Sequence, residues 1–205
     1  MEVNLLQCTD VDILVNAIRR CWRSENKSDT LATEKEVILG ENDRKLIKRI
    51  DSLGHHSTFE HVVFTFDIRG VSRALLQELV RHRIASYSVE STRFCLKRIT
   101  AYKDNLDSLL VLTGNDLVDN LGRMSLEKIV GLIEGGHQIP NDKLKYALPE
   151  SFKTNVVMTI NLRSFLNLYH LRISPQALWE FRLLTQAMVD VLPKDFQSLF
   201  FSQDT

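Results

Sequence analysis

Apolar and polar side chains alternate in several short stretches of the chain, and this pattern predicts β-strands. The clearest is HVVFTFDIRG, residues 61–70, in which every second side chain from Val62 to Ile68 is apolar. KTNVVMTINL, residues 153–162, is another strand candidate. EVNLLQC, residues 2–8, alternates weakly, and RFCLKRI, residues 93–99, favours a further short strand.

Between these strands the apolar side chains recur every three or four residues, which is the spacing of amphipathic helices. Thr9 or Asp10 can cap a helix that runs to residue 22, and Ser72 can cap one over residues 73–83. A helix is predicted over residues 33–53, with a break at Gly40 and a stop at Gly54. Two more are predicted over residues 141–148 and 163–172. The last is predicted over residues 174–193, with Ser174 as N-cap and with Glu180 and Arg182 facing outward. Residues 103–138 are predicted as helical segments separated by Gly114, Gly122 and Gly135–Gly136.

The order of these elements is mixed, because the strands are far apart in sequence and helices lie between them. No internal repeat is visible, and no G-x-G-x-x-G follows a strand, so neither a Rossmann site nor a P-loop is supported. The sequence therefore predicts the α+β class, with a single domain over residues 1–205.

The charge balance excludes some classes of partner. The 205 residues include 26 Lys and Arg and 26 Asp and Glu, which gives a formal net charge of +0. Broad binding of nucleic acid or of an anionic membrane needs a basic field, so we expect neither as a partner. Any anionic ligand must be held by a local cluster of cations.

The chain also lacks the marks of export. Its amino end has no basic segment followed by a long apolar core, so we expect no secretory signal, and no apolar run reaches the roughly 18 residues of a membrane span. Three scattered cysteines, Cys8, Cys21 and Cys95, fit a reducing cytoplasm better than a disulfide framework. We therefore expect a cytoplasmic protein.

The first polar cluster is GHHSTFEH, residues 54–61, between a predicted helix and a predicted strand. Its histidines, His55, His56 and His61, suggest a metal, but they lack a helical i, i+4 pair and no zinc-type cysteine spacing accompanies them. We expect no metal here. A solvated turn and a polar ligand-binding loop both remain open.

The second cluster is RHRIASYSVESTRF, residues 81–94. Basic residues in the last turn of a helix can simply meet the negative end of its dipole. However, successive side chains on a helix diverge by about 100°, so Arg81, His82 and Arg83 could grip different parts of one large anion. Arg93 adds a planar fork suited to phosphate or carboxylate. The pattern favours an anion site, to which hydroxyls would contribute from Ser86, Tyr87, Ser88, Ser91 and Thr92.

The third cluster is INLRSFLNLYHLR, residues 160–172. Asn161, Arg163 and Asn167 gather where the predicted strand passes into the next helix, and Arg172 lies further along that helix. Capping and surface polarity would explain these residues. Amides can also read the edge of a heterocycle, and junctions of this kind often bind ligands.

With these clusters in place, the sequence resembles the flavin-dependent thymidylate synthases. The family signature is RHR, any seven residues, then Ser, and it stands here as RHR-IASYSVE-S, from Arg81 to Ser91. HSTFEHVVFTF, Leu148-Pro149, NLRSFLNLYHLR and ALWE resemble further stretches of the family in the same order. The resemblance covers most of the chain and is thin over residues 103–138.

The resemblance implies the family's fold, a mixed or antiparallel sheet flanked by helices. It implies conversion of dUMP to dTMP, with 5,10-methylenetetrahydrofolate as one-carbon donor, FAD as redox cofactor and NADPH as reductant. It also implies a homotetramer in which each active site draws residues from more than one subunit.

The resemblance also assigns individual residues. Arg172 would be catalytic, because its fixed positive charge can stabilise the negative charge that develops at N3 and O2 of uracil and so make the ring carbon more nucleophilic. Lys145 and Arg172 would reach the nucleotide from other subunits. The implied FAD contacts are His55, Ser57, Arg81, His82, Arg83, Val89, Asn161, Leu162, Arg163 and Asn167. The implied dUMP contacts are Glu78, Leu79, Val80, Arg81, Val89, Glu90, Ser91, Thr92, Arg93, Lys145 and Arg172.

Four places depart from the family pattern, and they leave the phosphate contacts open. Gln77-Glu78-Leu79 stands where Arg-Gln-Trp is frequent, and Val89 stands where a Glu is common, with Glu90 beside it. Lys145 replaces an arginine and Gln176 replaces a histidine.

The reacting nucleophile is also undecided from sequence. No base neighbours the cysteines, so they are interpreted as packing residues. Ser91 could attack the substrate or hold it by a hydrogen bond, and we favour the hydrogen bond because only His82 and Glu90 are near it in sequence as bases. Two other classes of protein remain possible: a phosphate-directed hydrolase or transferase without flavin, and an RNA-binding module, against which the neutral charge argues.

Overall fold

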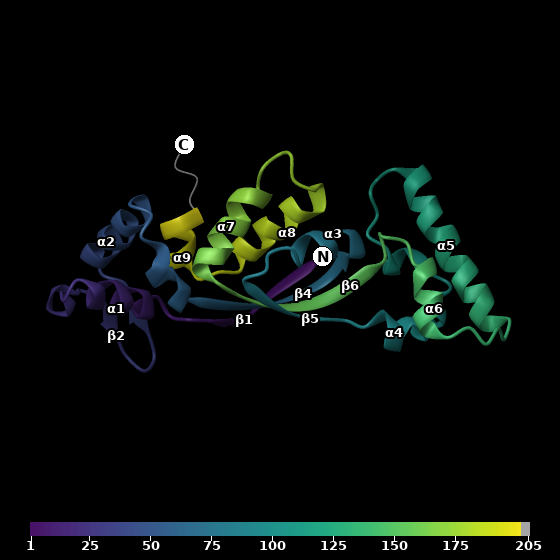
Figure 1. Cartoon of the computed structure of the whole chain (residues 1–205), viewed down its shortest axis with the longest axis horizontal. Helices are drawn as coiled ribbons and strands as arrows, with labels where there is room; N and C mark the ends of the chain where they lie inside the picture. The colour runs from purple at the N-terminus through teal and green to yellow at the C-terminus, as the bar shows by residue number, and fades with distance from the viewer. Residues whose placement is uncertain (202–205) are drawn as a thin grey trace. The chain divides into compact units, whose positions relative to one another are not determined.

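The computed structural model describes residues 1–201 and contains a four-stranded sheet in the order β1-β4-β6-β5 (Figure 1). The strands are β1 (Glu2–Cys8), β4 (Val63–Ser72), β5 (Ala85–Val89) and β6 (Lys153–Asn161). Three of them match predicted strands, whereas β5 lies within the second polar cluster, for which no strand was predicted. The α+β class is confirmed.

Hydrogen bonds near the strand ends show how the strands run. The amide of Thr9 donates to the carbonyl of Val63, while Met1, at the other end of β1, lies beside Gly70. The amide of Leu162 donates to the carbonyl of Val62, at the opposite end of β6 from Lys153. These pairings make β4 antiparallel to both β1 and β6, in agreement with the expected sheet.

The chain folds into two compact units, each built from separate segments. Unit 1 comprises residues 1–2, 68–81 and 88–156, and unit 2 comprises residues 3–67, 82–87 and the chain from Val157 onward. Strands β4 and β6 each contribute residues to both units. The expectation of a single domain over residues 1–205 stays a prediction.

Helices account for most of the remaining chain, and none within residues 1–201 is both long and apolar enough to cross a membrane. Unit 2 holds α1 (Val11–Cys21), α2 (Glu41–Ser52), the 3-10 helix η2 (His56–His61), α7 (Leu162–Arg172), α8 (Trp179–Asp190), α9 (Lys194–Phe196) and the short hairpin of β2 (Leu31–Ala32) and β3 (Val37–Ile38). Unit 1 holds α3 (Arg73–Leu79), α4 (Thr92–Cys95), η3 (Leu96–Tyr102), α5 (Asp116–Glu134), α6 (Asn141–Leu144) and η5 (Lys145–Ala147).

The core of unit 2 is aromatic. Phe64 on β4 meets the ring edges of Phe165 at 5.8 Å and Phe196 at 5.3 Å between centroids. Phe66 and Phe201 also pack against Phe165, which lies on α7. Edge-to-face pairs of this kind add to the free energy gained from burial, so the alternating phenylalanines of β4 fix α7 against the strand.

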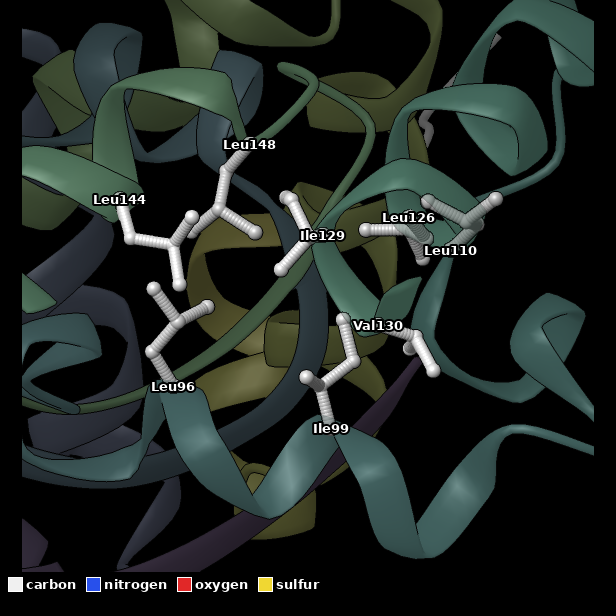
Figure 2. Close-up of a cluster of buried hydrophobic side chains, with 8 residues drawn as sticks. All are labelled: Leu96, Ile99, Leu110, Leu126, Ile129, Val130, Leu144 and Leu148. Atoms are coloured by element: carbon white, nitrogen blue, oxygen red, sulfur yellow. The ribbon is translucent and has the colours of Figure 1, made fainter. Parts of the chain in front are cut away.

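Unit 1 has an aliphatic core (Figure 2). Leu96 and Ile99 on η3 converge there with Ile129 on α5 and Leu144 on α6. Leu96 and Ile99 are three residues apart, and both are buried, which is helical and not strand spacing. The predicted strand over residues 93–99 is therefore wrong, because these side chains must face one core together.

Two predicted helix boundaries were also wrong. Residues 33–39 form no helix, because Leu31 pairs with Ile38 in the hairpin and the Asp29 carboxylate accepts hydrogen bonds from the first amides of α2. A Cβ on Gly40 would collide with Asp29, so glycine is required where α2 begins. Gly122 lies inside the continuous helix α5, where a Cβ would come within 3.3 Å of Leu110. It marks a close packing contact and no break.

The last long helix starts later than predicted. Residues 174–178 form a turn in which Ser174 hydrogen-bonds Gln176, and α8 begins at Trp179. Glu180, predicted to point outward, is buried and only 3% exposed, and Arg182 is partly buried. The predicted helix was extended too far toward its amino end, and Glu180 lies on the buried face of α8.

Candidate active site

The sequence predicted that the RHR motif forms the last turn of a helix, and this was wrong. The motif lies after the helix has ended. Helix α3 ends at Leu79, so Arg81, His82 and Arg83 lie in the turn and extended segment before β5. Arg81 belongs to unit 1, whereas His82 and Arg83 belong to unit 2. These three side chains therefore do not diverge as neighbours on one helix, although the motif still presents several hydrogen-bond donors.

In unit 2, Arg172 is held by two aromatic groups. Its guanidinium carbon lies 4.7 Å from the ring centroid of Phe181, and its Nε donates to Nε2 of His82 at 3.0 Å. The His82 ring itself meets the edge of Phe181 at 5.8 Å. The structure therefore brings together two predicted site residues that are 90 positions apart in the chain.

The bond from Arg172 orients the His82 ring. An imidazole nitrogen that accepts a hydrogen bond carries no proton, so in this arrangement the ring proton lies on Nδ1. The hydroxyl of Tyr87 donates to the backbone oxygen of His82 at 2.9 Å, and burial raises the pKa of Tyr87 to about 12. Tyr87 therefore stays protonated and keeps this contact over the whole physiological range.

The third polar cluster lies where η2 packs against α7 in unit 2. Arg163 at the start of α7 pairs with Glu60 on η2 at 2.5 Å. Asn161 caps the helix, since its side-chain oxygen accepts from the amide of Ser164. Asn167 follows Arg163 by four residues, which places both on one exposed side of the helix.

The other predicted residues of unit 2 differ in what they can offer a ligand. His55 and Ser57 are exposed at the beginning of η2, and Arg83 is exposed ahead of β5. Leu162 is fully buried, so only its backbone can contact a ligand. The cations and hydroxyls that could bind an anion are thus on the surface of this unit.

Unit 1 carries the remaining predicted residues. Glu78 and Arg81 form an ion pair at 3.4 Å across the end of α3. Leu79 between them is fully buried, so its side chain cannot bind substrate, while Val80 is exposed. Any contact of Leu79 with a ligand has to come from its backbone.

A second group in unit 1 spans residues 89–93, which we call the β5–α4 turn. Val89 ends β5, Glu90 and Ser91 link the two elements, and Thr92 and Arg93 begin α4. The backbone oxygen of Ser91 accepts from the amides of Phe94 and Cys95, which starts the helix. Lys145 lies half-buried at the beginning of η5, and α6, which precedes it, packs against α4.

A cavity of about 340 Å³ lies on one side of this turn, within unit 1. Glu90 and Thr92 line it together with the cations Arg98 and Lys153. Leu96 and Phe152 provide apolar wall. Its volume is in the range of small-molecule sites.

The cysteines and histidines show no reactive arrangement. Within residues 1–201 all three cysteines are free thiols, and no group of three His, Cys, Asp or Glu side chains could hold a metal ion. Burial, with a smaller contribution from Asp10, raises the pKa of Cys8 to about 11. Cys21, which the sequence placed among the packing residues, is instead exposed.

Sequence reasoning missed four residues that contact the predicted set. Glu60 lies within the first polar cluster but gave no signal for its pairing with Arg163. Phe181 followed the apolar pattern of a helix core, which hid its contact with Arg172. Asn141 and Asn155 contact the turn of residues 90–93, and nothing in their neighbouring sequence marked them.

The chain is similar to known proteins in both sequence and structure. A family model described as "Thymidylate synthase complementing protein" matches residues 4–196. The flavin-dependent thymidylate synthase of Wolinella succinogenes is 43% identical over 208 residues, covering 98% of this chain and 97% of that protein. Its counterpart in Campylobacter jejuni strain RM1221 is 40% identical, with 98% and 96% covered. A crystal structure of Thymidylate Synthase X from Helicobacter pylori, with FAD and dUMP, matches at a TM-score of 0.88 and 39% identity, covering 98% of both chains.

Proposed function

Because the chain belongs to the flavin-dependent thymidylate synthase family, we propose that it methylates dUMP to dTMP reductively with FAD as its redox cofactor. The observation that carries this proposal is the similarity, over 98% of the chain, to a structure that contains FAD and dUMP. Family membership also sets aside the flavin-free phosphate enzyme and the RNA-binding module.

The exposed side chains of unit 2 fit a cofactor with a diphosphate and a flavin ring. Arg83 and Arg163 supply cations for the phosphates, and Asn167 supplies amide donors and an acceptor for a ring edge. FAD, when bound and reduced by NADPH, would supply the hydride that reduces the transferred carbon. The residues proposed to hold it are His55, Ser57, Arg81, His82, Arg83, Val89, Asn161, Leu162, Arg163 and Asn167.

For dUMP we propose the residues that the signature marks, namely Glu78, Leu79, Val80, Arg81, Val89, Glu90, Ser91, Thr92, Arg93, Lys145 and Arg172. Arg81 and Arg93 suit the phosphate, since a guanidinium can make two parallel hydrogen bonds to it. Ser91 acts as a hydrogen-bond donor to the nucleotide and not as a nucleophile. Leu79 contributes through its backbone, because its side chain is buried.

Arg172 is the catalytic residue of the proposal. Its guanidinium is held in place by Phe181 and His82. A charge fixed before the reaction stabilises negative charge on N3 and O2 of uracil without reorganisation, and so makes the ring carbon nucleophilic. That carbon then attacks the one-carbon unit directly, without a protein nucleophile.

The cysteines support an attack without thiolate. The raised pKa of Cys8, about 11, leaves it protonated at neutral pH. Cys21 lies on α1 and Cys95 on α4, outside the residues proposed to hold either ligand. The proposed mechanism therefore forms no cysteine adduct with uracil.

We extend the proposal to the co-substrates and the assembly. 5,10-Methylenetetrahydrofolate supplies the carbon and NADPH the electrons. The protein works as a cytoplasmic homotetramer in which Lys145 and Arg172 reach a nucleotide bound mainly by another copy. Exposed apolar side chains support association, among them Phe94 at 73% and Tyr146 at 87% exposure.

The flavin spectrum of the purified protein tests the proposal. We expect the purified protein to be yellow, or to take up added FAD if it is colourless. Addition of dUMP should then change the absorbance of the bound flavin. A protein that binds neither FAD nor dUMP would overturn the proposed function.

A further inference from the structure

Asn155 on β6 holds Glu90, the first residue after β5. Its Nδ2 donates to Oε2 of Glu90 at 2.5 Å, and its backbone oxygen accepts from the amide of Glu90 at 2.9 Å. Its Oδ1 accepts from the amide of Gly70 at 3.0 Å. Because one end of the amide accepts from a backbone N–H and the other faces a carboxylate, only one orientation of the side chain satisfies both partners.

Asn141 holds Arg93, the second residue of α4. Its Nδ2 donates to the backbone oxygen of Arg93 at 2.9 Å, from the beginning of α6. The amide oxygen of Asn141 is buried and finds no partner within residues 1–201. A buried polar atom without a partner costs free energy, so the contact to Arg93 is retained at some expense to the fold.

Between these anchors lie the residues proposed to bind dUMP. Ser91 and Thr92 are fixed on one side by Glu90 and on the other by Arg93, and the oxygen of Ser91 is engaged by two amides of α4. A turn that is ordered before the ligand arrives avoids the entropy cost of ordering on binding.

We propose that Asn155, Glu90 and Asn141 are positioning residues for the nucleotide-binding turn. We assign Glu90, which stands among the residues proposed for dUMP, to positioning and not to direct contact: its Oε2 accepts from Asn155, and it acts on dUMP through Ser91. Glu90 therefore does not replace the acid that the family often carries at the position of Val89. This inference rests on the proposed function, in which the turn binds dUMP.

Three variants separate positioning from direct contact. Asn155→Asp puts a carboxylate opposite Glu90, so the dissociation constant for dUMP should rise about tenfold, the effect expected of a lost hydrogen bond to a charged group. Glu90→Gln alone should change it by less than about threefold, since the Gln oxygen still accepts from Asn155. The double variant Glu90→Gln with Asn155→Asp should return close to wild type, because the new Gln amide can donate to the new carboxylate on β6.

Asn141→Asp turns the donor toward Arg93 into an acceptor and should also weaken dUMP binding about tenfold. Asn16→Asp, which adds the same charge on the exposed side of α1, is the matched control and should leave binding unchanged. Binding of dUMP is measured by calorimetry on the FAD-loaded full chain, together with the flavin spectrum and the melting temperature.

The outcomes are distinct. The inference would be overturned if Glu90→Gln weakened dUMP binding as much as Asn155→Asp and the double variant did not recover. That result would place Glu90 in contact with dUMP. Wild-type affinity in Asn155→Asp and Asn141→Asp would overturn it as well. Should Asn155→Asp fold poorly, recovery of both folding and dUMP affinity in the double variant still supports the pairing. Failure of the wild-type protein to bind dUMP would instead refute the proposed function.

Discussion

Arg172 and Phe181 form a cation–π pair, with the guanidinium carbon 4.7 Å from the ring centroid. Phe181 is fully buried, so its ring cannot move aside without opening the core of unit 2. The pair therefore fixes the charge of Arg172 in place. Stacking of this kind suits the flat guanidinium better than the ammonium of a lysine.

Replacing Arg172 by Ala should leave FAD bound but remove dUMP affinity and turnover. The expected fall in kcat/KM is on the order of 10² or more, as for other fixed charges that stabilise a transition state. Steady-state kinetics and the flavin spectrum measure the two effects separately, and Arg49→Ala, on an exposed position of α2, is the control. Retained turnover would remove Arg172 from catalysis.

Ser91→Ala distinguishes a hydrogen-bond donor from a nucleophile. As a donor, Ser91 contributes to dUMP binding, so the variant should show a KM for dUMP raised about tenfold while kcat persists. Complete loss of turnover with dUMP binding intact would instead identify Ser91 as the attacking group.

The cysteines can be removed together. A variant with Cys8→Ser, Cys21→Ser and Cys95→Ser should still form dTMP, because no thiolate takes part in the proposed reaction. In the wild-type protein, Cys21 should react first with a thiol reagent because it is exposed, and Cys8 slowest because burial raises its pKa to about 11. A triple variant that is folded and binds FAD but forms no dTMP would contradict the account.

Asp43 is expected to be important for stability. It is fully buried and forms an ion pair with Arg19 at 2.5 Å, and it also accepts from the hydroxyls of Ser28 and Thr30. Asp43→Asn should lower the free energy of unfolding by about 3–5 kcal/mol, because it leaves the buried charge of Arg19 without its partner. Asp104→Asn, at an exposed site, is the control for the same chemical change. A melting temperature equal to wild type in both variants would refute this role.

The Asp43 carboxyl group should also make the stability of the fold depend on pH. Burial raises the pKa of Asp43, but hydrogen bonds from Ser28, Thr30 and Arg19 outweigh it and leave the pKa below its ordinary value. A folded-state pKa below the unfolded one gives stability that is present above about pH 4 and is lost as the pH falls through the folded-state pKa. Unfolding curves of wild type and Asp43→Asn should therefore converge below about pH 4. A constant difference between them down to the lowest pH would argue against this origin.

Sequence patterns predicted the strands β4 and β6 well, because one face of each is buried and Phe64 and Met158 follow that alternation. They failed at residues 93–99, where Cys95 and Leu96 could belong to either element and only the shared core with Leu144 decides for a helix. Glu180 was misplaced because a charged residue is rarely buried, and its environment is created by tertiary contacts.

Sequence motifs identified the candidate residues, but they did not predict which of these residues contact one another. The RHR motif and Arg172 were singled out, whereas the bond between Arg172 and His82 joins positions 90 apart and depends on the path of the chain. The roles of Asn141 and Asn155 rest on hydrogen bonds to the neighbouring turn, which no local pattern marks.

Formation of dTMP by the purified protein is the most direct test of the central claim. The protein is incubated with dUMP, 5,10-methylenetetrahydrofolate, NADPH and FAD, and nucleotides are separated by chromatography, with FAD omitted in a parallel sample after the bound flavin is removed. We expect dTMP in the complete mixture, little without FAD, and little from Arg172→Ala. Absence of dTMP from a folded wild-type protein that binds both FAD and dUMP would contradict it.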